Sequence, residues 1–200
     1  IDDWNETIRS EIPAMVDAGI PSFKLYMTYP AMMVGDRNMF RALEELGKYG
    51  AIAGVHCENA GVIDALIAQA KEEGRLSPAS HPATRPNPLE AEAVSRLLRM
   101  AQVARVPVVI VHLSTKEALA EVRAARASLR DGSIQTVSTD HCSFTLAQKN
   151  AGREDFTKIP GGMPGVETRG ILLWSEGVTK GRITVPTMCR VLSETPAKLY

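Results

Sequence analysis

The stretch Val106–Leu113, VPVVIVHL, decides the fold. Its near-continuous run of β-branched residues predicts a strand buried on both faces, as in a parallel sheet. Parallel strands need crossover connections, which are usually helices. A helical pattern runs up to this strand from Asn87, and another follows it from Thr115 to about Ala127. The sequence therefore predicts βαβ units and a parallel sheet.

Three further segments are typical of strands in the same sheet. They are SFKLYM at 22–27, AIAGVHCE at 51–58 and SIQTVSTDH at 133–141. Helical patterns separate them at the start of the chain, at 36–49 and at 60–73. Two architectures fit this order, a (β/α)8 barrel and an open doubly wound sheet. No G-x-G-x-x-G or P-loop motif follows any strand, so the nucleotide-binding version of the open sheet has no support.

Capping residues mark where the expected helices begin. Asp36 is expected to cap the second helix, and Glu58 with Asn59 the third. Asn87 is expected to cap the fourth helix, with Glu90 completing a capping box. The helical period predicts three buried stripes, formed by Phe40, Leu43 and Leu46, by Val62, Ile63, Leu66, Ile67 and Ala70, and by Val94, Leu97, Leu98 and Ala101. The proline-rich segment between the last two of these helices, residues 75–88, has the length of a loop that serves a site.

The composition is that of an ordinary globular chain, with 44% hydrophobic and 23% charged residues. The 23 basic residues balance the 23 acidic ones, so nucleic acid is not an expected partner. No apolar stretch is long enough to cross a membrane, and we expect a cytoplasmic protein. Cys57, Cys142 and Cys189 are too few and too widely spaced for a disulfide framework, and we expect small buried residues.

Polar residues follow the ends of three expected strands. His56 ends the second strand, His112 the third, and Asp140 the fourth. The carboxyl ends of parallel strands meet at one face, where α/β proteins bind ligands. A single histidine in such a place is more often a hydrogen-bonded core residue, but this repetition favours a divalent metal, with zinc first among the candidates.

Lys24 lies inside the apolar first strand, where an unpaired ammonium would be costly. Two explanations are open. The residue chemistry favours an ordinary ion pair with an aspartate or glutamate. The alternative is a carbamate, formed when the neutral amine adds carbon dioxide, whose two oxygens could bridge two metal ions.

Several motifs, taken together and in order, resemble one enzyme family. They are SFKLYMTYP, GVHCEN, HPATRP with EAEAVSRL, VIVHLST, TVSTDHCSF and DFTKIPGGMPGVETR. These are similar to the successive signatures of the dihydropyrimidinase/hydantoinase family of metal-dependent amidohydrolases, and the resemblance spans nearly the whole chain. It implies a (β/α)8 TIM-type barrel that opens cyclic amides such as dihydropyrimidines and hydantoins.

The resemblance also implies roles for individual residues. Lys24 would be carboxylated and would bridge two Zn²⁺ ions, with His56, His112 and Asp140 as further metal ligands. Asp140 would also act as general base and acid, and Tyr29 would stabilise the oxyanion. The substrate would lie near Tyr29 and near the backbone of Gly161 and Gly162, although Gly161 stands where many relatives have Asn.

Parts of the family pattern are missing between residues 1 and 200. No H-x-H strand for the first metal occurs, and a strand with a substrate-contacting loop is absent before Asp140. We therefore expect a fragment, a partial barrel domain over 1–200 with a junction near 127–129. The complete protein is expected to be a homo-oligomer that acts on a small cyclic amide.

Three alternatives to this function remain. An allantoinase or dihydroorotase would share the barrel and the bridging lysine. A non-catalytic scaffold homologue would share the fold, although the retention of Lys24, His56, His112 and Asp140 argues against it. The chain could also be an inactive fragment, which would hold at most one metal ion weakly.

Overall fold

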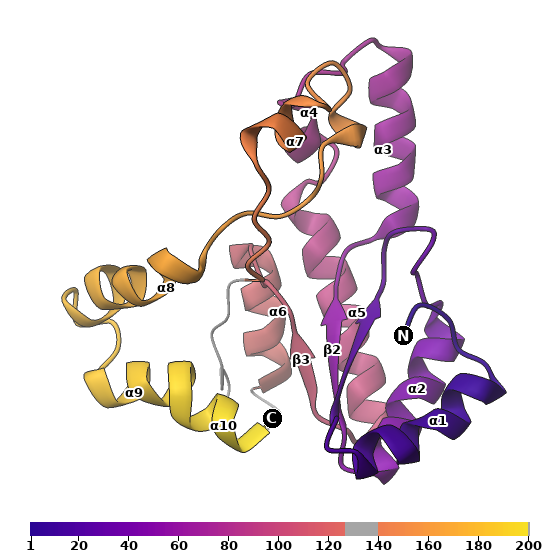
Figure 1. Ribbon diagram of the computed structural model, residues 1–200, viewed down its shortest axis with the longest axis vertical. Helices are drawn as coiled ribbons and strands as arrows, with labels where there is room; N and C mark the ends of the chain where they lie inside the picture. Colours follow the sequence, from indigo (N-terminus) through magenta and orange to yellow (C-terminus); the bar gives the residue numbers. More distant parts are fainter. Residues whose placement is uncertain (127–139, 200) are drawn as a thin grey trace. The chain divides into compact units, whose positions relative to one another are not determined.

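Three parallel strands form the sheet in the computed structural model, which describes residues 1–126 and 140–199 (Figure 1). They are β1 (Ser22–Tyr26), β2 (Ile52–His56) and β3 (Val108–Ile110), paired in that order. The register places Lys24 opposite Gly54 and Tyr26 opposite His56. The expected α/β alternation with a parallel sheet is thus confirmed, whereas three strands are not a complete barrel.

The chain packs as two compact units. Of the described residues, the first unit takes in 1–69 and 84–126, and the second takes in 70–83 and 140–199. The predicted fourth strand at 133–139 and the predicted junction near 127–129 lie outside the described residues.

Helices cover one face of the sheet in the first unit. These helices are α1 (Glu6–Asp17), α2 (Asp36–Lys48), α5 (Asn87–Ala104) and α6 (Lys116–Arg126). A further helix, α3 (Ala60–Glu72), follows β2, and its last residues belong to the second unit. The core joins strand residues Leu25 and Val55 to Leu43 of α2 and Leu97 of α5, all fully buried. Alternation along a strand sends Lys24 and His56 to the opposite face. The sheet therefore has an apolar face toward the helices and a polar face away from them.

Most of the predicted helix stripes are buried. The buried members are Leu43, Leu46, Ile63, Ala70, Val94, Leu97 and Ala101. Val62 is an exception, because 43% of its surface is exposed. The third strand also differs from prediction, since its three residues are only half-buried. Among the described strands β3 pairs with β2 alone, so it lies at an edge.

Two of the predicted caps are wrong. Gly35 and not Asp36 caps α2, and the Asp36 carboxylate accepts a hydrogen bond from Arg96 at 2.6 Å. Pro86 and not Asn87 caps α5. The Glu90 carboxylate accepts hydrogen bonds from the backbone N–H groups that precede α6, at Ser114 and Thr115, both at 2.8 Å. The Asp36 and Glu90 carboxylates, which the sequence pattern predicts to cap their own helices, thus bind groups that lie elsewhere in the fold.

The second unit is helical in its described part. Its elements are α4 (Ser80–Ala83), α7 (Leu146–Asn150), η1 (Phe156–Lys158), α8 (Val166–Leu172), η2 (Leu173–Val178), α9 (Val185–Cys189), η3 (Arg190–Glu194) and α10 (Thr195–Leu199). The short helix α4 lies within the predicted proline-rich loop, and its His81 ring packs edge-on against Phe156. Cys142 and Cys189 are exposed, contrary to expectation, whereas Cys57 of the first unit is buried as predicted.

Candidate active site

The polar face of the sheet carries Lys24, Tyr26 and His56, which the pleat places on the same side. Lys24 is opposite Gly54, so no side chain of β2 stands directly beside it. Its Nζ lies 5.1 Å from the centroid of the Tyr26 ring. The lysine therefore avoids the helix-covered core, which answers how a single charge fits inside an apolar strand.

Two histidines meet at the carboxyl ends of β2 and β3. The ring centroids of His56 and His112 are 4.3 Å apart, with an angle of 71° between the planes. His56 is 7% exposed. The expectation that the strand ends bring these imidazoles together is met by this geometry. Two adjacent imidazoles are a donor set that suits zinc or a similar divalent ion.

Tyr29 joins this group from the loop after β1. Its ring centroid lies 5.0 Å from that of His56 and 6.2 Å from that of Tyr26. Tyr29 also has a φ of +68°, and His112 has a φ of +38°. Asp140, in the second unit, has a φ of +45°. Left-handed backbone is uncommon in residues with a side chain, and such strain gathers at functional sites.

Sequence reasoning missed two members of the site, Glu58 and Arg85. The Oε2 atom of Glu58 lies 2.7 Å from Nε2 of His56 and 2.9 Å from Nη1 of Arg85. Burial acts to raise the pKa of the Glu58 carboxyl, but the hydrogen bond with His56 and the charge of Arg85 outweigh burial and lower this pKa. Glu58 is therefore an ionised partner of His56. Of the two expected caps of α3, only Asn59 caps it, accepting from the Val62 N–H at 3.1 Å.

The remaining predicted residues belong to the second unit. The carbonyl oxygens of Gly162 and Pro160 accept hydrogen bonds from Nζ of Lys149, at 2.8 and 2.6 Å. Gly162 has a φ of +119° and lies against Cys142, whereas no atom approaches the Cβ position of Gly161. Lys149 therefore holds the loop that contains Gly161 and Gly162 through two carbonyl oxygens of that loop. The structure gathers Lys24, Tyr29, His56 and His112 in the first unit and leaves Asp140, Gly161 and Gly162 in the second.

The donor set fits part of a metal centre. A Glu58 carboxylate that accepts from Nε2–H leaves the lone pair of His56 on Nδ1, the nitrogen that a cation could then take. Lys24 on the same face and His112 beside His56 would complete the ligands from the first unit. Within residues 1–126 and 140–199, no group of three or more His, Cys, Asp or Glu side chains could hold a metal ion.

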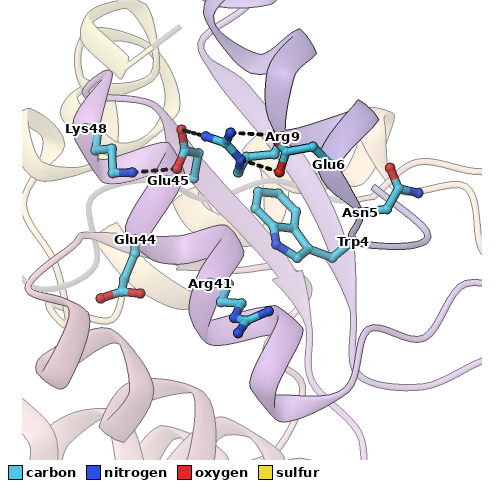
Figure 2. Close-up of a pocket in the computed structure, with 8 residues that line it drawn as sticks. All are labelled: Trp4, Asn5, Glu6, Arg9, Arg41, Glu44, Glu45 and Lys48. Carbon is cyan, nitrogen blue, oxygen red and sulfur yellow. Dashed lines mark hydrogen bonds and ion pairs between the residues drawn. The ribbon is translucent and has the colours of Figure 1, made fainter.

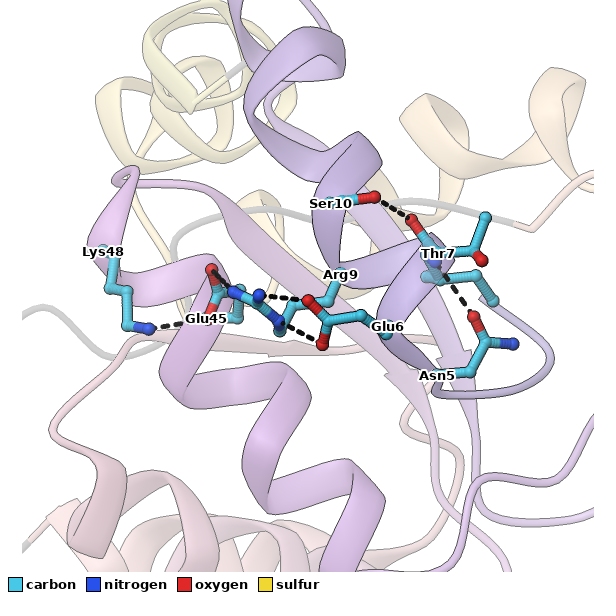
Figure 3. Close-up of polar contacts among 8 residues, drawn as sticks. Asn5, Glu6, Thr7, Arg9, Ser10, Glu45 and Lys48 are labelled. Carbon is cyan, nitrogen blue, oxygen red and sulfur yellow. Dashed lines mark hydrogen bonds and ion pairs between the residues drawn. The ribbon is translucent and has the colours of Figure 1, made fainter.

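A hollow of about 410 Å³ lies between α1 and α2, away from the polar face (Figure 2). Its residues are Trp4, Asn5, Glu6, Arg9, Arg41, Glu44, Glu45 and Lys48. Figure 3 shows the buried Glu45 between Arg9 and Lys48, with Arg9 also paired to Glu6. Three cations balance three carboxylates here, so the hollow has no excess charge for an ionic ligand. Its ion pairs attach α1 to α2.

Known proteins resemble this chain over almost its full length. It is 34% identical to D-phenylhydantoinase of Escherichia coli across 98% of the chain and 53% of that enzyme. The solved dihydropyrimidinase from Brevibacillus agri matches 100% of the chain and 54% of its own, with a TM-score of 0.94 and 31% identity. The L-hydantoinase from Arthrobacter aurescens matches 98% of the chain and 55% of its own, with a TM-score of 0.85 and 26% identity.

The chain spans about half the length of these relatives. No family model matches it. In the described part of the chain, no helix has both the length and the apolar character to cross a membrane.

Proposed function

Because this chain belongs to the hydantoinase and dihydropyrimidinase family, we propose that the whole protein hydrolyses a cyclic amide C–N bond in hydantoins or dihydropyrimidines. The observation that carries the proposal is the pairing of His56 with His112 beside Tyr29, on the sheet face that also presents Lys24. The similarity to enzymes of this name supports it.

The metal centre is part of the proposal. Lys24 in carboxylated form, His56, His112 and Asp140 would hold two Zn²⁺ ions, and we assign these four residues as the ligands. Bound zinc would supply Lewis-acid activation of water and of the ring carbonyl. The adjacent imidazoles and the ionised Glu58 behind His56 are the features of this chain that suit such ligation.

The chain's own residues would move the protons. Water adds to the ring carbonyl carbon, the carbon–nitrogen bond breaks, and the leaving nitrogen needs a proton. Asp140 would accept the proton of the attacking water and return it to that nitrogen. The Tyr29 hydroxyl would donate a hydrogen bond to the oxygen on which negative charge develops. Gly161 and Gly162 would offer backbone groups to the ring.

The complete architecture is likewise proposed. We assign residues 1–200 to part of a (β/α)8 barrel whose remaining strands lie elsewhere in the whole protein. The match to the E. coli enzyme extends over 244 residues while the chain has 200, so that enzyme has additional residues inside the matched span. This difference supports a junction within the chain, which we place near 127–129. A cytoplasmic homo-oligomer completes the proposal.

An assay of the full-length protein on four rings tests the function. We expect turnover of hydantoin or dihydrouracil that exceeds turnover of allantoin and dihydroorotate. Preference for either of the last two would replace the proposal with an allantoinase or dihydroorotase. Bound zinc without turnover of any ring would favour a scaffold homologue.

A further inference from the structure

Glu58 holds two partners on one oxygen atom. Its Oε2 meets Nε2 of His56 at 2.7 Å and Nη1 of Arg85 at 2.9 Å. The side chains of Glu58 and Arg85 are each 18% exposed, and that of His56 is 9% exposed. The three groups therefore form a largely buried chain from guanidinium to carboxylate to imidazole. Hydrogen bonds to charged groups in such surroundings are stronger and more directional than exposed ones.

Arg85 also lies over a second residue of the site. Its Cζ atom is 5.8 Å from the centroid of the Tyr29 ring, within the range of a cation–π contact. In the described part of the chain, its Nε atom is buried without a hydrogen-bond partner. Because Nε makes no hydrogen bond within that part of the chain, the contacts with Glu58 and Tyr29 are the ones that determine where the guanidinium lies.

We propose that Glu58 and Arg85 are positioning residues, with Arg85 fixing both the carboxylate that orients His56 and the ring of Tyr29. The inference rests on the proposed function, because it takes His56 as a metal ligand. A carboxylate on Nε2 fixes the tautomer and the ring plane of the imidazole, so that Nδ1 keeps its lone pair in one direction. The planar guanidinium can bind the carboxylate and lie over an aromatic ring at once, which an ammonium cannot do equally well.

This arrangement gives the proline-rich segment a role. Arg85 comes from the end of that segment, between α4 and α5, and reaches Glu58 just after β2. A loop residue thereby sets the orientation of a strand-end histidine. The same segment was expected to serve a site because of its length, and Arg85 is the residue through which it does so.

The test uses zinc affinity of the full-length protein, measured by competition with a chelator, as a readout separate from activity. Glu58→Ala is expected to weaken zinc binding roughly 10–100-fold, the usual effect of losing such a partner. Glu58→Gln is expected to lose less, because its amide oxygen can still accept from Nε2–H. Arg85→Lys is expected to fall between these two variants in zinc affinity. With saturating zinc it should also lower kcat more than it raises KM, through Tyr29.

Arg96→Lys is the matched control. Arg96 also bridges two carboxylates, Asp36 and Glu92, but not at His56. Arg96→Lys should have the zinc affinity of the parent, and His56→Ala should have a far lower zinc affinity. Zinc affinity within twofold of the parent in both Glu58→Ala and Arg85→Lys would overturn the inference, as would unchanged affinity in His56→Ala. Absence of ring hydrolysis with the predicted order of zinc affinities would refute the proposed function alone. Since Arg85→Lys keeps charge and size, it remains informative if Glu58→Ala does not fold.

Discussion

His56 and His112 lie with their ring centroids 4.3 Å apart, although more than fifty residues separate them in the chain. His56 ends β2 and His112 follows the end of β3, and these two strands are hydrogen-bonded neighbours, with Val55 opposite Ile110. A parallel sheet brings the carboxyl ends of neighbouring strands together without any direct attraction between the side chains. The pair is therefore a product of topology.

Removal of either imidazole should empty the centre that we propose. In the full-length protein, His112→Ala should lose zinc and lower kcat/KM by roughly 100-fold or more, since several kcal/mol of charge stabilisation would be lost. Metal analysis and the ring assay measure both effects. His81→Ala, which removes a histidine of α4 that packs on Phe156, is the control. Parental zinc content in His112→Ala would contradict the assignment.

Gly47 should not tolerate a methyl group, although it lies inside helix α2. Alanine usually stabilises a helix interior by about 1 kcal/mol relative to glycine. Here the added Cβ would overlap Cγ1 of Val106, so Gly47→Ala should destabilise by about 1–3 kcal/mol in denaturant unfolding. Val106→Ala should restore part of the loss in the double variant. Gly61→Ala, in the first turn of α3, meets only an ordinary contact at 3.8 Å and should not destabilise the protein.

The Arg9–Glu45 pair should stabilise the attachment of α1 to α2. Arg9→Met leaves the Glu45 carboxylate, 6% exposed, with Lys48 as its remaining ion pair, and should lower the free energy of unfolding. Adding Glu45→Leu should recover stability, because the buried charge is then gone. Unfolding free energies of the two single variants and the double variant give the coupling. Arg41→Met, which changes another residue of the same hollow, is the control. If the losses of unfolding free energy in the two single variants simply add in the double variant, Arg9 and Glu45 are not coupled.

Two adjacent glycines of the second unit, Gly161 and Gly162, should respond differently to alanine. Gly162→Ala combines a φ of +119° with a Cβ placed 2.5 Å from Cβ of Cys142, and it should destabilise the protein by about 1–3 kcal/mol. Gly161→Ala meets no atom within 4 Å and should leave unfolding unchanged. A raised KM in Gly161→Ala at parental stability would then report contact with substrate. Equal losses of stability in both variants would refute the distinction.

Asp155 should make stability depend on acid pH. Its carboxylate accepts from the hydroxyl and the N–H of Thr157, at 2.7 and 3.1 Å, and the hydroxyl bond in particular lowers the pKa of Asp155 below 3.8. A lowered pKa stabilises the folded state above pH 3.8, and this contribution disappears as the pH falls through the folded value. Asp155→Ala should therefore be less stable than the parent near neutrality, with a difference that shrinks on acidification. The unfolding midpoint against pH measures this, and a constant difference would contradict it.

Local patterns predicted the secondary structure well where burial supports them. Helices α2 and α5 show their predicted stripes in the core, with Leu43 and Leu97 fully buried. The errors occur where a side chain has a choice of partners. Asp36 and Glu90 satisfy capping patterns in the sequence, yet they bind Arg96 and the backbone before α6. A capping pattern describes what a residue can do locally, and a stronger tertiary partner overrides it.

The candidate site follows the same division. His56 and His112 could be named from their places at strand ends, and Lys24 from its place inside an apolar strand, because each position is local to one strand. Tyr29 could be named only through the resemblance to the enzyme family. Glu58 could have been found from its position two residues after His56, but the capping pattern of α3 concealed it. Arg85 could not be found, since nothing in its neighbours predicts which way a proline-rich loop turns.

The order of strands and helices, and the polar residues at the strand ends, are set by the sequence itself, because hydrophobic periodicity acts within one element at a time. Only the tertiary structure decided which imidazole nitrogen of His56 is already bonded, and that Arg85 holds the carboxylate bonded to it. These hydrogen bonds form because the path of a loop brings the atoms within about 3 Å of each other. A local sequence pattern does not determine that path.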